Sequence, residues 1–214
     1  LEFRRVVFRS PDNVWIRFQR LLTNIFLKNL EGESFITKQK ARIFIGLSLL
    51  GLLLNALYIF ALLVSGSGFI IFQNIVITII IIVSLFLTYK GQYFRATSFF
   101  TISVIVSQVI NMHLFGMDGK AFHDDFFFLL GFLVLCILFN TERIILINAG
   151  IIVIGSLSFF LFKHIIFKEF SAENDLIRVI NFIFSVVIVT IILLVMSRLV
   201  KKTMIVADEQ SRQL

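Results

Sequence analysis

The feature that most constrains this chain is a series of six apolar stretches, five long and the fourth short, separated by polar segments. A helix needs about 20 apolar residues to cross the roughly 30 Å of bilayer hydrocarbon. Helices satisfy their own backbone hydrogen bonds in lipid, and no stretch alternates as an outer-membrane strand would. We therefore predict an all-α polytopic membrane protein, a six-transmembrane-helix bundle over 43–200 with spans at 43–64, 69–89, 96–115, 124–140, 144–162 and 176–200.

Charge orients this bundle. The chain is 58% hydrophobic and only 15% charged, with a formal net charge of +7. Placing both termini in the cytoplasm puts 16 of the 20 Lys and Arg residues inside, in agreement with the positive-inside rule. The positive net charge is then explained by the orientation of the protein in the membrane. We therefore expect the lipid bilayer as its partner and no binding to nucleic acid. We expect a multi-pass protein of the bacterial inner (plasma) membrane.

The cytoplasmic N-terminal segment, residues 1–42, is predicted to hold an amphipathic helix. Ser10 and Pro11 form a helix start, and no signal-peptide core precedes the charges. The apolar residues that follow at helical spacing are Val14, Phe18, Leu21, Leu22, Ile25 and Phe26. Arg and Lys residues between them favour a helix lying on the inner leaflet. The alternative is packing against a partner or a cytoplasmic domain.

The stretch HLFGMDGKAFHDDFFFLL, residues 113–130, collects ionisable side chains at the outer end of the bundle. The apolar run after it is short, so its helix must recruit polar residues to cross the bilayer. Gln108 and Asn111 share a face of the preceding span. We predict a metal or ligand site at this outer mouth, formed by His113, Asp118, His123, Asp124, Asp125, Glu173 and Asp175. Imidazole with carboxylates suits a divalent cation such as Zn²⁺ or Mn²⁺, and carboxylates alone suit Ca²⁺ or Mg²⁺.

Simpler explanations of the same residues stay open. Asp124 or Asp125 would be a good N-cap for the fourth helix, and Asp118 is an ordinary turn acid. The two histidines, His113 and His123, would also serve as a pH-sensing pair.

The sixth span runs without a breaker into the tail, so we predict that 201–214 begins a cytoplasmic coiled-coil signalling helix. Positions three and four apart form a seam for a parallel pair of helices. The seam consists of Leu193, Met196, Val200, Thr203, Ala207, Gln210 and Leu214. The pattern is still running at Leu214, so we expect a further domain in the full protein.

The stretch FGMDGKAFHDDFFFLLGFLVLCILF, the short NTER turn and the tail VADEQSRQL resemble the six-helix membrane domain of bacterial membrane-anchored class III adenylate/guanylate cyclases. The resemblance covers the chain from about Arg42 onward. It implies a homodimer whose sixth helices pair two cytoplasmic catalytic domains in cis. ATP or GTP with Mg²⁺ or Mn²⁺ would bind in that output domain, which lies outside this chain. We expect this chain itself to hold no catalytic residues and not to be an enzyme.

We thus expect a membrane receptor and dimerisation anchor of a nucleotide cyclase in cAMP or cGMP signalling. One alternative is the membrane sensor domain of a histidine kinase or diguanylate cyclase. Another is a small transporter or channel. A proton relay would normally place ionisable residues deep in the membrane, and no Asp, Glu, Lys or Arg lies deep in a predicted span.

Overall fold

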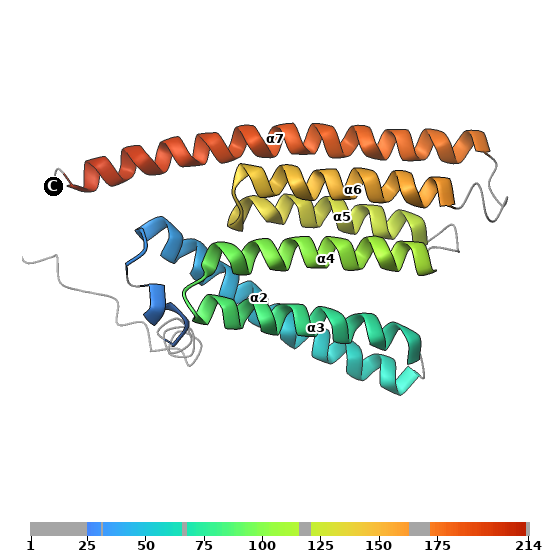
Figure 1. Ribbon diagram of the computed structural model, residues 1–214, viewed down its shortest axis with the longest axis horizontal. Coiled ribbons are helices and arrows are strands. Elements are labelled where there is room, and N and C mark those ends of the chain that lie inside the picture. Colours follow the sequence, from blue (N-terminus) through green and yellow to red (C-terminus); the bar gives the residue numbers. More distant parts are fainter. Residues whose placement is uncertain (1–24, 31, 66–67, 116–120, 163–171, 213–214) are drawn as a thin grey trace, which may run out of the picture.

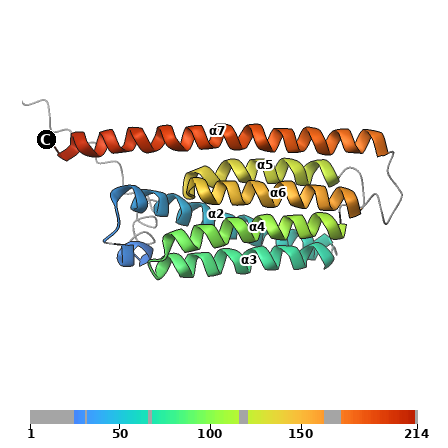
Figure 2. The same ribbon diagram turned by 45° about the horizontal axis from the view of Figure 1, so that its top comes forward.

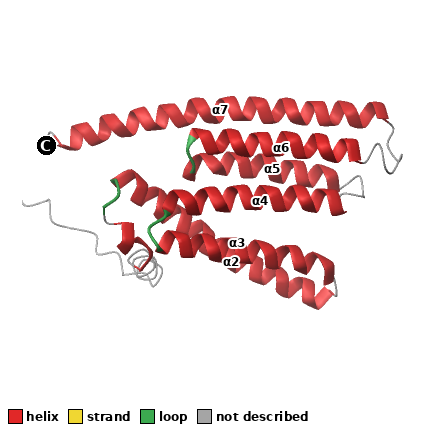
Figure 3. Cartoon of the chain, in the orientation of Figure 1, coloured by secondary structure: helices red, strands yellow, loops and turns green. Residues whose placement is uncertain are grey.

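The computed structural model describes residues 25–30, 32–65, 68–115, 121–162 and 172–212, and these contain helices and short turns with no strand. Figure 3 shows how short the described turns are. The elements are the 3₁₀ helix η1 (Lys28–Leu30) and the α-helices α2 (Phe35–Ser65), α3 (Gly68–Tyr89), α4 (Tyr93–Phe115), α5 (Ala121–Phe139), α6 (Glu142–Phe162) and α7 (Ala172–Arg212). The all-helical prediction is confirmed.

Five of the helices, α2, α3, α4, α6 and α7, are long and apolar enough to cross a membrane. The apolar part of α5 is shorter, Phe126–Phe139. The helix itself begins at Ala121 and has 19 residues, so it measures about 28 Å. The short apolar run therefore does sit in a longer helix that takes in polar residues at its start.

The helices lie side by side, with α7 along one edge and the α2–α3 pair along the other (Figures 1 and 2). α3 packs against α2 and α4, and α6 packs against α4 and α7. We call the end where α2, α4 and α6 finish, at Ser65, Phe115 and Phe162, the distal end. The opposite end, where α3 and α5 finish, is the proximal end. α7 extends beyond the other helices at the proximal end (Figure 1).

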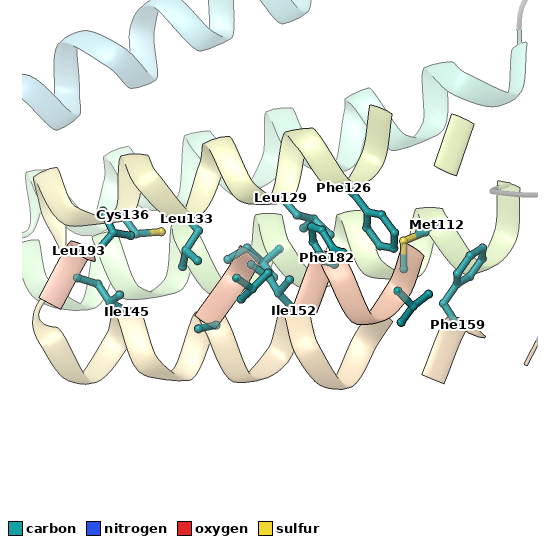
Figure 4. Close-up of a cluster of buried hydrophobic side chains, with 14 residues drawn as sticks. Met112, Phe126, Leu129, Leu133, Cys136, Ile145, Ile152, Phe159, Phe182 and Leu193 are labelled. Atoms are coloured by element: carbon teal, nitrogen blue, oxygen red, sulfur yellow. The ribbon is translucent and has the colours of Figure 1, made fainter. Parts of the chain in front are cut away.

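The largest core cluster joins α4, α5, α6 and α7 (Figure 4). On α5 it contains Leu129, Leu133 and Cys136, which recur at helical spacing and are fully buried. Phe126 of α5 stacks on Phe182 of α7 with ring centroids 3.8 Å apart. This cluster fixes α7 against α5 and α6 over the length of the bundle.

The proximal end is closed by the chain segment that precedes α2. Leu30 is 1% exposed and packs in a cluster with Phe44, Tyr93 and Phe139. The Asn29 side-chain amide donates a hydrogen bond to the Tyr89 carbonyl at the end of α3. The described part of the N-terminal segment therefore packs on the chain's own helices. Neither the leaflet interpretation nor the partner interpretation anticipated this contact, and residues 1–24 lie outside the described residues.

The outward faces of the helices remain strongly apolar. Phe60, Phe72, Ile154 and Phe184 are each exposed by 66–69%. Water-soluble monomers rarely expose contiguous apolar surface on this scale. The exposed faces are those of a membrane protein, with hydrocarbon in place of water.

Candidate functional site

His113 lies in the last turn of α4, at the distal end. Its Nδ1 is 2.8 Å from the Val109 carbonyl oxygen, one turn earlier in the same helix. Its Nε2 is 3.0 Å from the hydroxyl oxygen of Ser158 on α6. The ring also meets Phe159 edge-on, with centroids 5.4 Å apart. His113 therefore joins α4 to α6 in this structure.

A glycine allows this contact. Gly155 faces Val109 where α4 and α6 cross, one turn before Ser158. A side chain at Gly155 would separate the two helices. The backbone of α4 approaches α6 closely enough for the His113 ring to reach the Ser158 hydroxyl.

Both ring nitrogens of His113 are thus engaged within the helix pair. Binding a cation through Nε2 would require His113 to release Ser158, because the same ring nitrogen cannot bond the hydroxyl group and a metal together. Among the residues whose side chains the structure describes, no three His, Cys, Asp or Glu residues gather as a metal-binding group.

For most of the other predicted residues of the outer mouth, the structure gives the position in a helix but not the side chain. His123, Asp124 and Asp125 lie in the first turn or so of α5, and Glu173 and Asp175 lie in the first turn of α7, but their side chains are outside the description. Asp118 lies outside the described residues. Since α5 begins at Ala121, Asp124 and Asp125 fall inside the helix and not at its N-cap. Acidic residues near the start of a helix are favoured by the positive end of its dipole.

Gln108 and Asn111 do not join His113. Gln108 is 8% exposed, and its Oε1 accepts a hydrogen bond of 3.1 Å from Gln73 Nε2 on α3. Asn111 is half-buried and lines a groove between α3 and α4. The shared face predicted for these two amides therefore looks toward α3, while His113 looks toward α6.

The predicted seam on α7 divides into two parts. Leu193 is 5% exposed and belongs to the core of its own bundle. Met196, Val200 and Thr203 are exposed. Ala207 and Gln210 lie within α7, but their side chains are outside the description, and Leu214 lies outside the described residues. A seam for a second copy is thus available only from Met196 onward.

An ion pair lies where α7 leaves the bundle. Arg198 Nε is 3.3 Å from Glu142 Oε2, at the start of α6. The arginine side chain is 69% exposed, so this pair contributes at most about 1 kcal/mol. Beyond it the described side chains Leu199, Val200, Lys202 and Thr203 are all exposed.

Sequence reasoning missed four residues of the helix contacts and the groove, namely Gly155, Ser158, Ser103 and Ser107. Ser103, Ser107 and Asn111 are spaced by four residues on α4, so they share one face of that helix. That spacing is visible in the sequence and was the available signal. No comparable signal exists for Ser158, whose partner is 45 residues away.

Comparison of the chain with protein-family models, with curated proteins and with solved structures gives no match.

Proposed function

We propose that this chain is a membrane receptor and dimerisation anchor of a bacterial nucleotide cyclase. In this proposal it passes a signal through α7 to a cytoplasmic catalytic domain. The observation that carries the proposal is the continuity of α7, one helix of 41 residues from Ala172 to Arg212. Such a helix measures about 60 Å, roughly twice the hydrocarbon thickness. It would connect the far side of a bilayer to a cytoplasmic domain without a joint.

The packing of α7 fits this role. Its buried face, containing Val179, Phe182, Val186, Thr190 and Leu193, holds it on α5 and α6. After Arg198 the described side chains are free of the bundle, and positions Met196, Val200 and Thr203 keep the spacing of a coiled-coil seam. A shift of α7 against the bundle would therefore change how two copies of the exit helix meet.

The buried polar residues weigh against the transporter alternative. Among the described residues those side chains are all Ser, Thr, Asn or Gln, such as Asn140, which donates to Thr101 Oγ1 at 3.1 Å. Proton relays and ion pathways usually use ionisable residues within the membrane. A histidine kinase or diguanylate cyclase output would use the same exit helix.

The orientation belongs to the proposal as well. We place six spans in the bacterial inner membrane with the proximal end and both termini in the cytoplasm, on the distribution of Lys and Arg. The distal end would then face outward, where His113 and the acids of α5 and α7 receive the signal.

Cysteine cross-linking along α7 tests the dimer. Cys136 is the single cysteine, so Cys136→Ser provides a background in which single cysteines are introduced from 196 to 212. We expect oxidative cross-linking in membranes to be strongest at Met196, Val200, Thr203, Ala207 and Gln210. Equal yields at positions half a turn away, such as Ile205 and Arg212, would argue against a paired exit helix.

A fusion tests the signalling role itself. α7 is joined after Arg212 to a class III adenylate cyclase catalytic domain, with zero to seven residues inserted at the junction, and cyclic AMP is measured. A seven-residue insertion restores the heptad register, so we expect it to match the direct fusion, while insertions of one to four residues change the rate. A rate that ignores the register would contradict transmission through α7.

A further inference from the structure

The part of α3 and α4 nearest the distal end encloses a groove of about 520 Å³. Ligand pockets in proteins usually measure about 300–1,000 Å³. Its apolar lining includes Phe72, Val76 and Ile80 of α3 and Ile102, Ile110 and Leu114 of α4. The groove begins within about 6 Å of the distal ends of both helices and runs for about 12 Å along α3 and about 18 Å along α4.

Both helices contribute polar groups to this groove. Ser103, Ser107 and Asn111 lie along one face of α4, and Gln73 faces them from α3. The two amides lie near the distal end, and Ser103 lies deepest. The groove is therefore mostly apolar, with two hydroxyl groups along α4 and two amides at its distal end.

These polar groups differ from several other serines of the bundle. Ser84, Ser98 and Ser156 each donate to the carbonyl four residues earlier, at 2.7 Å. Ser103, Ser107 and Asn111 form no side-chain hydrogen bond with any residue that the structure describes. In hydrocarbon an unpartnered polar group is costly. The groove therefore contains hydrogen-bond donors and acceptors that lipid tails cannot satisfy.

The lining also restricts what can fill the groove. Close approach of another helix needs small residues at the contact. Ser103 and Ser107 are small, but the large, exposed side chains of Phe72, Ile110 and Leu114 line the same groove and would hold a second helix away. The lining contains no charged residue, so an anionic head group would find no counter-charge. A flexible aliphatic chain with an uncharged hydrogen-bonding head group matches both properties.

We propose that this groove binds one neutral single-chain amphiphile from the bilayer. The aliphatic chain lies along Val76, Ile80 and Ile102, and a hydroxyl or carbonyl head group bonds Asn111 and Gln73 at the distal end of the groove. The Gln73 side-chain amide donates one N–H to Gln108. The carbonyl oxygen and the second N–H of Gln73 can therefore bond the ligand. This site stands independently of the signalling role proposed above, since it depends only on α3 and α4.

The test uses the whole chain in phosphatidylcholine nanodiscs. The probe is a monoacylglycerol that carries a photoreactive diazirine in its acyl chain and an alkyne tag. Adducts are located by mass spectrometry, and unlabelled monooleoylglycerol or oleate is added as competitor. We expect adducts to concentrate in 72–80 and 102–114 despite the excess of bulk lipid. We also expect monooleoylglycerol to compete about tenfold better than oleate.

Two variants separate the groove from the general lipid surface. Ser103→Leu with Ser107→Leu fills the groove with apolar atoms and should reduce labelling about tenfold. Ser185→Leu is the matched control, because Ser185 is exposed on α7 and bonds the Asn181 carbonyl. Asn111→Leu should abolish the preference for monooleoylglycerol over oleate while the hydrocarbon part of the groove remains.

Adducts spread over all exposed helix faces in proportion to their area would overturn the proposal, and this result comes from the unaltered chain. Labelling that survives the double serine substitution would do the same. So would competition by oleate equal to that by monooleoylglycerol. A disulfide between two copies at Val106→Cys, in the Cys136→Ser background, that monooleoylglycerol does not suppress would assign the groove to a second copy instead.

Discussion

Val109 of α4 and Gly155 of α6 touch so closely that a Cβ atom built on the glycine would lie 2.7 Å from Val109 Cγ1. This contact sets the separation of α4 and α6. One turn further toward the distal end, the same separation brings His113 Nε2 to 3.0 Å from Ser158 Oγ. The close packing of Val109 on Gly155 thus allows the polar contact between His113 and Ser158 one turn away.

Gly155→Ala should therefore destabilise the bundle although alanine favours helices. The added methyl group must push the β-branched Val109 aside, which costs about 1–3 kcal/mol in a packed core. Thermal unfolding in detergent, followed by circular dichroism, measures the change. Gly150→Ala on the same helix is the control, since nothing lies within 4 Å of that position, and it should stabilise the helix by about 0.5–1 kcal/mol. Equal effects of the two substitutions would show that α4 and α6 are not in close contact.

Leu193→Ala should cost about 2–5 kcal/mol, because it removes a buried side chain from the core between α7 and its own bundle. Met196→Ala, three residues later, should change the stability of a single copy very little, because Met196 is 48% exposed. The measurement is the same unfolding experiment at protein concentrations low enough to disfavour association. A larger loss at Met196 than at Leu193 would mean that α7 turns a different face to the bundle.

Gly91→Ala should detach the segment before α2. Gly91 has φ +78°, a backbone conformation that favours glycine, and an added Cβ would lie 2.7 Å from the Asn29 carbonyl oxygen. We expect faster hydrogen exchange at the amides of Lys28–Leu30, because their contact with the α3–α4 turn is lost. Gly46→Ala, which meets no atom within 4 Å, should leave that exchange unchanged. Unaltered exchange in both variants would refute the docking of this segment.

Mn²⁺ or Zn²⁺ should raise the unfolding temperature if the outer mouth binds a cation, because a ligand that binds only the folded state stabilises it. Replacing both Asp124 and Asp125 by Asn should abolish the increase. The matched control is Asp208→Asn with Glu209→Gln. It also removes two negative charges, but from the proximal part of α7, far from the outer mouth. A shift of the same size in the Asp124 and Asp125 variant would exclude these acids as ligands.

Much of the fold could be predicted from the sequence because hydrocarbon permits few alternatives. The long apolar stretches, the lack of proline after Pro11 and the absence of a breaker near residue 200 specify helices, their number and the long exit helix. The start of α2 at Phe35 was less accessible, because the charged residues Lys38, Lys40 and Arg42 hide a helix that continues beyond its apolar part.

The sequence did not determine which side of each helix is buried. A soluble helix shows its buried side as an apolar stripe, but helices that are apolar on every side carry no such stripe. Leu193 continued an apparent coiled-coil seam, yet it points into its own bundle. His113 was grouped with the acids that follow it, yet it contacts Ser158.

By itself, then, the sequence determined the class of the protein, its helices and the uninterrupted course of α7, since these follow from local composition and the bilayer's demand for satisfied backbone groups. Only the tertiary structure decided which side chains meet. The rotation of each helix about its axis depends on how its neighbours pack, as at Val109 and Gly155. That rotation turned His113 toward α6 and aligned Ser103, Ser107 and Asn111 along the groove.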